Sequence, residues 1–117
     1  MCCFRKKGSH KRTVPITRPV IAWRVFACEG TKLYAPHVHT GERYHFKSLG
    51  WNRTRKPSFD EEGYSTSGFY ARKSKRRAKK AQAAAHYRVA VRKVALAGVV
   101  VTHRGGYQAE MLKVLGE

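Results

Sequence analysis

The stretch VAVRKVALAGVVVTH, residues Val89 to His103, decides the fold that this chain is expected to adopt. It is rich in β-branched residues and mostly alternates in character, which is typical of a β-strand. Because it is too long for one flat strand, we expect a bulge or bend at Gly98. Arg104-Gly105-Gly106 then predicts a turn, after which Tyr107 to Leu112 returns as the partner strand.

An earlier segment predicts a second hairpin. VIAWRVFA, residues Val20 to Ala27, alternates along its length, and Glu29-Gly30-Thr31 resembles a turn. A second short run, Lys32 to Ala35, follows the turn. Two short runs with a glycine-containing connection are typical of a β-hairpin.

Between the two hairpins, the sequence predicts a strand that leads into a helix. SGFYA, Ser67 to Ala71, is the expected strand, and the helix is expected at about residues 74–87 with Ser74 as its cap. Ala78, Ala81 and Ala85 give this helix a narrow stripe of small residues for docking on the sheet.

These elements predict an α+β fold, built on a small antiparallel sheet with one principal helix. Residues 1–19 contain two prolines and no hydrophobic period, so we expect a disordered basic N-terminal arm. Residues 20–117 are expected to form a single α+β domain, because a chain of this length supports one modest core. An irregular polar insert is expected at about residues 39–63.

The charge balance indicates a polyanionic partner. The chain has 25 Lys and Arg residues against 7 Asp and Glu residues, a formal net charge of +18 on 117 residues. Such an excess is informative about partners rather than about fold. It favours nucleic acid, DNA or RNA, or a partner that is itself bound to nucleic acid. A basic surface that only keeps the chain soluble is the simpler alternative.

The densest cationic stretch, ARKSKRRAKK, coincides with the start of the predicted helix. Cations in the first turns of a helix oppose the helix dipole, and like charges three or four residues apart repel each other. A phosphate group removes this conflict, since Lys and Arg side chains can converge on it. We therefore predict phosphate contacts from Arg72, Lys73, Lys75, Arg76, Arg77, Lys79 and Lys80.

The polar insert supplies a second group of candidate binding residues. Single-stranded nucleic acid needs aromatic stacking surfaces among the cations, whereas a duplex can be held through its phosphates alone. Trp51 is the best candidate for a stacking platform, while Phe46 and Phe59 are expected to complete the core. The predicted binding residues of the insert are Arg43, Lys47, Trp51, Arg53, Arg55 and Lys56.

The C-terminal half resembles a small domain of unknown function found in bacterial and phage proteins. The resemblance rests on GFYARKS and on VRKVALAGVVVTHRGGYQAEMLKVL, and is most specific over Val94 to Glu110. It implies a compact, sheet-rich fold and a bacterial or mobile-element setting, and it implies no activity. Members of that domain often carry a Cys and His knuckle just before GFYA, but this chain has GYSTSGFYA there.

Metal and catalytic sites find little support in the sequence. Cys28, His37, His39 and His45 lie within a short span, but a structural zinc site normally shows two closely spaced ligand pairs. His103 and Glu110 flank the predicted turn and could face each other as a dyad. No phosphate-binding glycine loop or nucleophile elbow is present in the sequence. We therefore expect no catalytic residue, no bound metal and no cofactor.

The function that the sequence predicts is non-enzymatic nucleic-acid binding by a phage or mobile-element protein in the cytoplasm of a bacterial host. No apolar run approaches the roughly 20 residues of a membrane span, and no signal peptide is expected. One alternative is a phage inhibitor of host defence, such as an anti-CRISPR protein, that docks on a host nucleoprotein enzyme. Another alternative is a zinc-binding module. The sequence does not separate DNA from RNA as the ligand.

Overall fold

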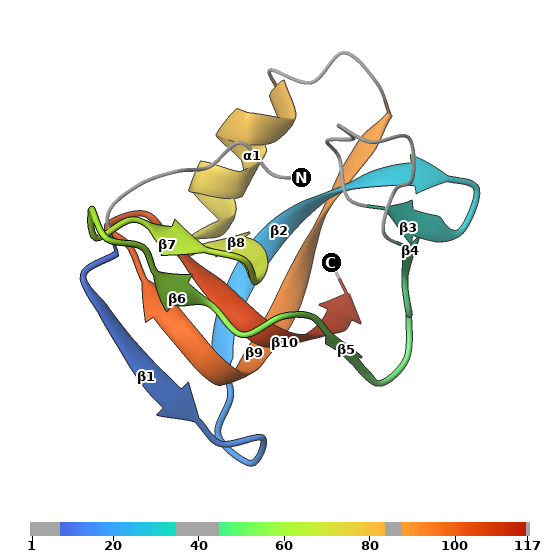
Figure 1. Cartoon of the computed structure of the whole chain (residues 1–117). Coiled ribbons are helices and arrows are strands. Elements are labelled where there is room, and N and C mark those ends of the chain that lie inside the picture. Colours follow the sequence, from blue (N-terminus) through green and yellow to red (C-terminus); the bar gives the residue numbers. More distant parts are fainter. Residues whose placement is uncertain (1–7, 35–44, 84–87, 117) are drawn as a thin grey trace.

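The computed structural model describes residues 8–34, 45–83 and 88–116. The described residues form ten strands and one helix (Figure 1). In chain order these are β1 (His10–Val14), β2 (Val20–Glu29), β3 (Lys32–Tyr34), β4 (His45–Phe46), β5 (Trp51–Arg53), β6 (Ser58–Phe59), β7 (Ser65–Thr66), β8 (Phe69–Arg72), α1 (Lys75–Ala83), β9 (Val89–Thr102) and β10 (Gly106–Gly116).

Four strands close into a small antiparallel barrel. β9 pairs with β2 along one edge and with β10 along the other, and β8 bridges the gap between β10 and β2. The closing contact is short, because β8 and β2 are registered only at Trp23 and Arg72. The expected α+β class is therefore wrong: the described fold is mostly β, with a closed four-stranded barrel and one short helix.

The barrel core is formed by the inward-facing residues of its long strands. Its fully buried members include Phe26, Val94, Leu96 and Leu112. The β3–β4 extension adds Phe46, whose ring meets that of Phe26 edge-on at 4.9 Å between centroids. Phe46 thus contributes to the core, as the sequence predicted.

A charged side chain also lies in the core. Arg24 is only 7% exposed, and its guanidinium group lies over the ring of Phe46 at 4.9 Å. The same group donates a hydrogen bond to the backbone carbonyl of Tyr70 on β8. Arg24 therefore cannot contribute to a phosphate-binding surface.

The long C-terminal hairpin follows the sequence prediction closely. β9 and β10 are registered from Tyr107 and Thr102 onward, and the ladder shifts where Gly98 and Val99 together oppose Glu110. Gly98 has a φ of +78°, and the Val99 amide donates to the Glu110 carboxylate at 3.2 Å. The predicted bulge is confirmed, and it lets β9 bend enough to pair with β2, β10 and β1.

The second predicted hairpin is also confirmed. β2 and β3 pair antiparallel with Glu29 opposite Lys32, so the turn consists of Gly30 and Thr31. Gly30 adopts a φ of +63°, which glycine tolerates better than other residues.

The N-terminal arm is not disordered along its whole length. Residues His10–Val14 form β1, which pairs with β9 from His10 opposite Thr102 to Val14 opposite Gly98. Only Val14 of this strand is buried, so the strand lacks the hydrophobic alternation by which it could have been recognised. β1 forms because the edge of β9 is available for pairing, and this depends on tertiary structure rather than on the local sequence. Residues 1–7 lie outside the described part of the chain.

The polar insert is more regular than expected. Its described part contributes β4, β5 and β6, and β5 pairs with β10. Asn52 on β5 is buried and donates to the carbonyl of Leu112, while its oxygen accepts from the amide of Lys47. These bonds anchor the insert to the barrel. Phe59, which was expected in the core, is 38% exposed.

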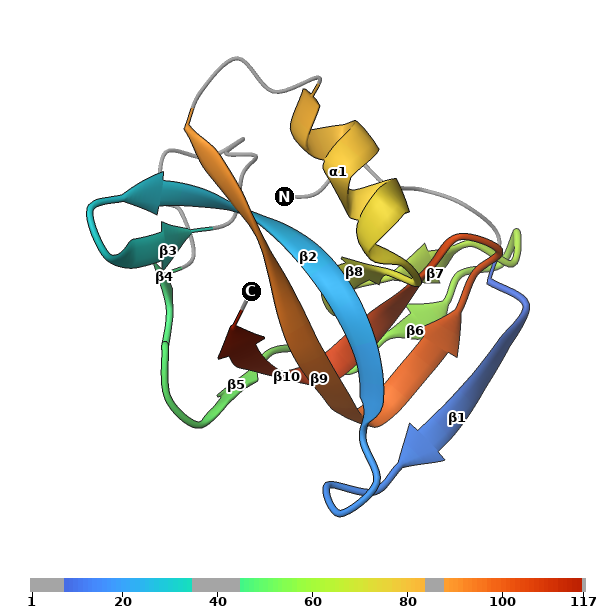
Figure 2. The ribbon, with the colours of Figure 1, turned by 180° about the vertical axis from the view of Figure 1, so that it is seen from behind.

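Helix α1 spans Lys75–Ala83 and packs on β2, β8 and β9 (Figure 2). Residues 84–87, into which the prediction continued the helix and which include Ala85, lie outside the described residues. The helix begins at Lys75, and Ser74 caps it by accepting a hydrogen bond from the Arg77 amide at 3.2 Å. Ala78 is fully buried and docks the helix on the barrel. Cations occupy most of the other described positions from Lys75 to Lys80, and the core cluster is formed by residues outside the helix, so the helix is not the principal element of the fold.

Candidate nucleic-acid interface

The cations at the start of α1 are presented to solvent. Six of the seven that the sequence singled out are exposed, and Arg72 is partly buried on β8. The first turn of the helix contains no acidic residue. The exposed six are Lys73, Lys75, Arg76, Arg77, Lys79 and Lys80.

The β9–β10 turn lies against this group of cations. The Lys73 amide donates to the Gly105 carbonyl at 3.1 Å, and a side chain on Gly105 would meet the Arg77 guanidinium at 3.1 Å. Arg104, in the same turn, is exposed. The turn therefore adds Arg104 to the six exposed cations, and we call these seven residues the helix-start surface.

Aromatic rings lie beneath two of these seven cations and beneath the neighbouring Arg72. The Lys75 ammonium is 5.2 Å from the centre of the Trp23 ring, and the Lys73 ammonium is 5.4 Å from that of Tyr107. On β8, the Arg72 guanidinium lies 4.9 Å from the Tyr70 ring. Such contacts hold a cation over a ring face by electrostatic attraction. The helix-start surface thus combines positive charge with half-buried aromatic rings.

Sequence reasoning missed Arg104, Trp23 and Tyr107 as parts of this site. Arg104 stands alone in a glycine turn, and its position beside the helix depends on tertiary structure. Trp23 sits in an alternating strand, where an aromatic residue is usually part of the core. One available signal was the alternation itself, which places Trp23 on the opposite face from the buried Phe26.

The candidate residues of the insert do not join this surface. Lys47, Arg53, Arg55 and Lys56 are exposed, but β5 lies in the lower part of Figure 1 and α1 in the upper part. Trp51 is partly buried on β5 and is paired with Lys113 of β10. Arg43 lies outside the described residues. Among the described residues, Trp51 and Arg53 on β5 therefore lie apart from α1.

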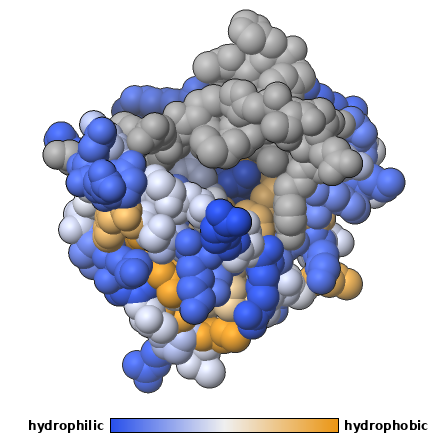
Figure 3. Space-filling model, in the orientation of Figure 1, coloured by the Kyte–Doolittle hydropathy of each residue, from blue (hydrophilic) through white to orange (hydrophobic). Residues whose placement is uncertain are grey.

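Figure 3 shows the hydropathy of the surface on the side of the molecule that faces the viewer in Figure 1. In Figure 3, hydrophilic side chains occupy most of the described surface, and apolar patches are small and separated from one another. A broad apolar docking face is therefore not visible on the described part of this side.

A buried polar cluster lies where β7 meets the β9–β10 hairpin. His103 is 1% exposed, and its Nε2 atom lies 2.9 Å from the Ser65 hydroxyl and 2.6 Å from the Gln108 side-chain oxygen. Ser65 also donates to the Gln108 oxygen. Gln108 in turn donates to the Ser67 carbonyl at 2.8 Å. The cluster ties the β6–β7 hairpin to the barrel.

This geometry corrects the proposed dyad of His103 and Glu110. His103 contacts Ser65 and Gln108, whereas the Glu110 carboxylate serves the Gly98 bulge. Although serine and histidine are in contact, the Ser65 hydroxyl and the Gln108 oxygen both lie at the same imidazole nitrogen, Nε2. A hydrolytic triad instead uses one nitrogen for the nucleophile and the other for the orienting residue. The cluster is also buried, so a substrate could not reach it.

We expect the cluster to stabilise the fold and to have no effect on the affinity for nucleic acid. Replacing Gln108 by Met keeps the volume and removes the acceptor for Ser65 and His103, which leaves buried polar groups unsatisfied. Unfolding in urea should show a loss of about 1–3 kcal/mol in the free energy of unfolding. Affinity for nucleic acid should be unchanged at a temperature where the variant is folded. A loss of affinity in the folded variant would place part of the binding site at the cluster.

The candidate zinc ligands are only partly within the described chain. His37 and His39 lie outside it, whereas Cys28 is partly buried on β2 and His45 is exposed on β4. His45 stacks on the ring of Tyr34 at 5.0 Å. Across residues 8–34, 45–83 and 88–116, no group of three or more potential ligands is close enough to hold a metal ion.

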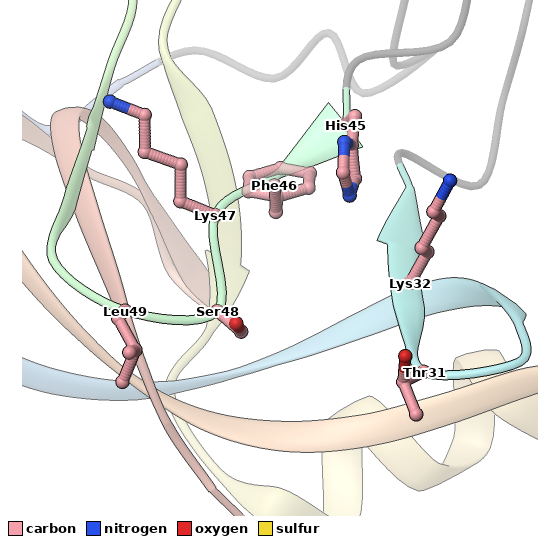
Figure 4. A pocket seen from close by; sticks show the side chains of 7 residues that line it. All are labelled: Thr31, Lys32, His45, Phe46, Lys47, Ser48 and Leu49. Carbon is pink, nitrogen blue, oxygen red and sulfur yellow. The ribbon is translucent and has the colours of Figure 1, made fainter.

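An open hollow of about 420 Å³ lies beside β3 and β4 (Figure 4). It is lined by Thr31, Lys32, His45, Phe46, Lys47, Ser48 and Leu49. The side chains of Lys47 and Leu49 point away from His45 and Lys32, so the polar groups do not converge on one point. The hollow therefore lacks the convergent polar groups of a small-molecule site.

No protein-family model, curated protein or solved structure matches the chain. The resemblance of Val94 to Glu110 to a phage domain accordingly stays a prediction. The one helix within the described residues has nine residues, too few to cross a membrane.

Proposed function

We propose that this protein is a non-enzymatic nucleic-acid-binding protein that contacts backbone phosphates through the helix-start surface. The observation that carries the proposal is the set of seven exposed cations on the start of α1 and the adjoining turn, with no acidic residue in the first turn of the helix. The resemblance to a phage domain supports a setting in the cytoplasm of a bacterial host.

Electrostatics favours an anionic ligand at this place. Cations three and four residues apart on a helix repel each other, and those in its first turn also oppose the helix dipole. Both unfavourable terms fall when a phosphate group lies between the side chains, and hydrogen bonds from Lys or Arg to phosphate are strengthened by charge. Arg24 is a contrasting case, because this cation is buried in the core and is not available to a ligand.

The proposal predicts a steep dependence of binding on salt. If about six phosphates are contacted, affinity should fall about a thousandfold between 50 and 200 mM monovalent salt, because each contact releases condensed counterions. Fluorescence anisotropy of a labelled oligonucleotide, titrated with the purified protein at several salt concentrations, measures the slope. The experiment must use only the purified protein and the oligonucleotide. If the protein instead docks on a host nucleoprotein, no binding is expected when that nucleoprotein is absent.

Two results would contradict the proposal. One is the absence of micromolar binding to both DNA and RNA at low salt. The other is binding whose affinity hardly changes with salt, since contacts to phosphates cannot then be its source.

A further inference from the structure

We propose that the ligand of the helix-start surface is a single strand, whose bases stack on Trp23 and Tyr107 while its phosphates contact the surrounding cations. This inference rests on the proposed function, since it names the form of nucleic acid that the same surface takes. It also replaces Trp51 by other rings as the stacking platform.

Both rings lie where the cations are. Lys73 and Lys75 flank the helix cap Ser74, and each holds its ammonium group over one ring, that of Tyr107 and that of Trp23 respectively. Both rings are partly exposed, and that of Tyr107 also packs against the core. Trp23 is opposite Arg72 and Tyr107 is opposite Ala71, so the two rings lie on the two sides of the end of β8 that leads into the helix cap. Alternation of cations and aromatic rings is the composition of surfaces that bind single strands without strict sequence preference.

The barrel holds both rings on rigid backbone. Trp23 on β2 is paired with Lys93 of β9 and with Arg72 of β8. Tyr107 on β10 is likewise paired with β9 and with β8. Since each ring belongs to a strand with neighbours on both sides, little ordering of the protein backbone is needed when a base stacks on it.

A base can take the place of the cation on each ring. Stacking of a base on an aromatic side chain typically strengthens binding by about 5-fold to 150-fold, whereas an exposed cation over a ring contributes about two- to fivefold. Lys73 and Lys75 are exposed and have long flexible stems, so each ammonium group can leave its ring for a nearby phosphate. The exchange therefore favours the bound strand.

A duplex cannot make this exchange. Its bases are stacked on each other, so it can use the phosphate contacts of the surface but not the rings. The structure thus predicts a preference for single strands over a duplex of equal length, and a stacking signal from the single strand alone.

Tryptophan fluorescence tests the inference directly. The chain has two tryptophans, so Trp51→Phe leaves Trp23 as the only indole. We expect oligo(dT) or oligo(U) to quench the emission of this variant, and a duplex of the same length to bind without comparable quenching. Quenching by either single strand supports stacking of a pyrimidine base on Trp23, since oligo(dT) and oligo(U) share the pyrimidine ring and differ in the sugar and in the 5-methyl group.

Trp23→Phe is the matched control, because it leaves Trp51 as the only indole. Its emission should hardly change on binding. The inference is overturned if Trp51 is quenched and Trp23 is not, or if single strands bind with no quenching of either. Failure of every nucleic acid to bind would instead overturn the proposed function itself.

Affinity provides a second measurement that does not depend on emission. Trp23→Leu combined with Tyr107→Leu should weaken binding of oligo(dT) by at least about tenfold and leave binding of the duplex within about twofold. Equal losses for both ligands would show that the rings only support the fold or position Lys73 and Lys75. If this variant does not fold, the quenching experiment decides alone, because it retains Trp23 and Tyr107.

Discussion

Reversal of three charges on α1, Arg76→Glu, Lys79→Glu and Lys80→Glu, is expected to weaken nucleic-acid binding by about a thousandfold at 100 mM salt. Each lost phosphate contact removes about 0.9 decades of affinity at this salt concentration through counterion release, and each glutamate adds repulsion. The three side chains are exposed and none of them takes part in the cation–ring contacts at the helix start. Anisotropy titration of one oligonucleotide against wild type and variant measures the loss.

Stability should move little, or slightly upward, in the same variant. Glutamate at Arg76, in the first turn, suits the helix dipole, and the reversals remove repulsion among neighbouring cations, whereas glutamate at Lys80, in the last turn of the described helix, opposes the dipole slightly. Thermal melting therefore separates binding from folding. A sharp fall in melting temperature would show that the cations serve an acidic partner within the protein, such as Asp60-Glu61-Glu62, and our assignment of the helix-start surface would then be wrong.

The insert offers a control with the same change in net charge. Arg53→Glu, Arg55→Glu and Lys56→Glu alter three exposed cations on and just after β5, a strand that lies away from α1 in both ribbon views (Figures 1 and 2). We expect a much smaller loss of affinity, because only the long-range field changes, and screening at 100 mM salt limits that field to about 10 Å. If this variant loses as much affinity as the helix variant, the binding site includes the insert, as the sequence alone had suggested.

The parts of the fold that follow local patterns could be predicted from the sequence. The alternation of Val89 to His103, with Gly98 inside it, gave the long hairpin and its bulge, and Ser74 was recognised as the helix cap. Closure of the barrel could not be predicted. It depends on one register contact between β2 and β8 and on how far β9 bends, neither of which leaves a pattern in the sequence.

The candidate site likewise contains residues that could be predicted from the sequence and residues that could not. The exposed cations of α1 are adjacent in sequence and were identified from that stretch alone. Arg104, Trp23 and Tyr107 reach the helix start from three other places in the chain, because β2, β8 and β10 are neighbours in the barrel. The strand β1 was missed since its charged residues form a strand only by pairing with the edge of β9.

Replacement of Gly98 by alanine is expected to destabilise the fold by about 2–5 kcal/mol. A residue other than glycine at a φ of +78° is strained, at about 1–2 kcal/mol. A Cβ atom at Gly98 would also lie 2.5 Å from the Glu110 carboxylate oxygen, so the carboxylate must move and the Val99 amide loses its acceptor. The lost hydrogen bond adds about 1–3 kcal/mol. Urea unfolding of the variant measures the sum.

Two comparisons separate strain from the loss of the hydrogen bond. Gly30→Ala has a similar φ of +63° but open space around the new methyl group, so it should cost only the strain. Glu110→Ala already removes the acceptor of the Val99 amide, and adding Gly98→Ala to it should again cost only the strain. If Gly98→Ala costs no more than Gly30→Ala, the carboxylate at the bulge does not stabilise the bend. The bend of β9, which closure of the barrel requires, would then depend on Gly98 alone.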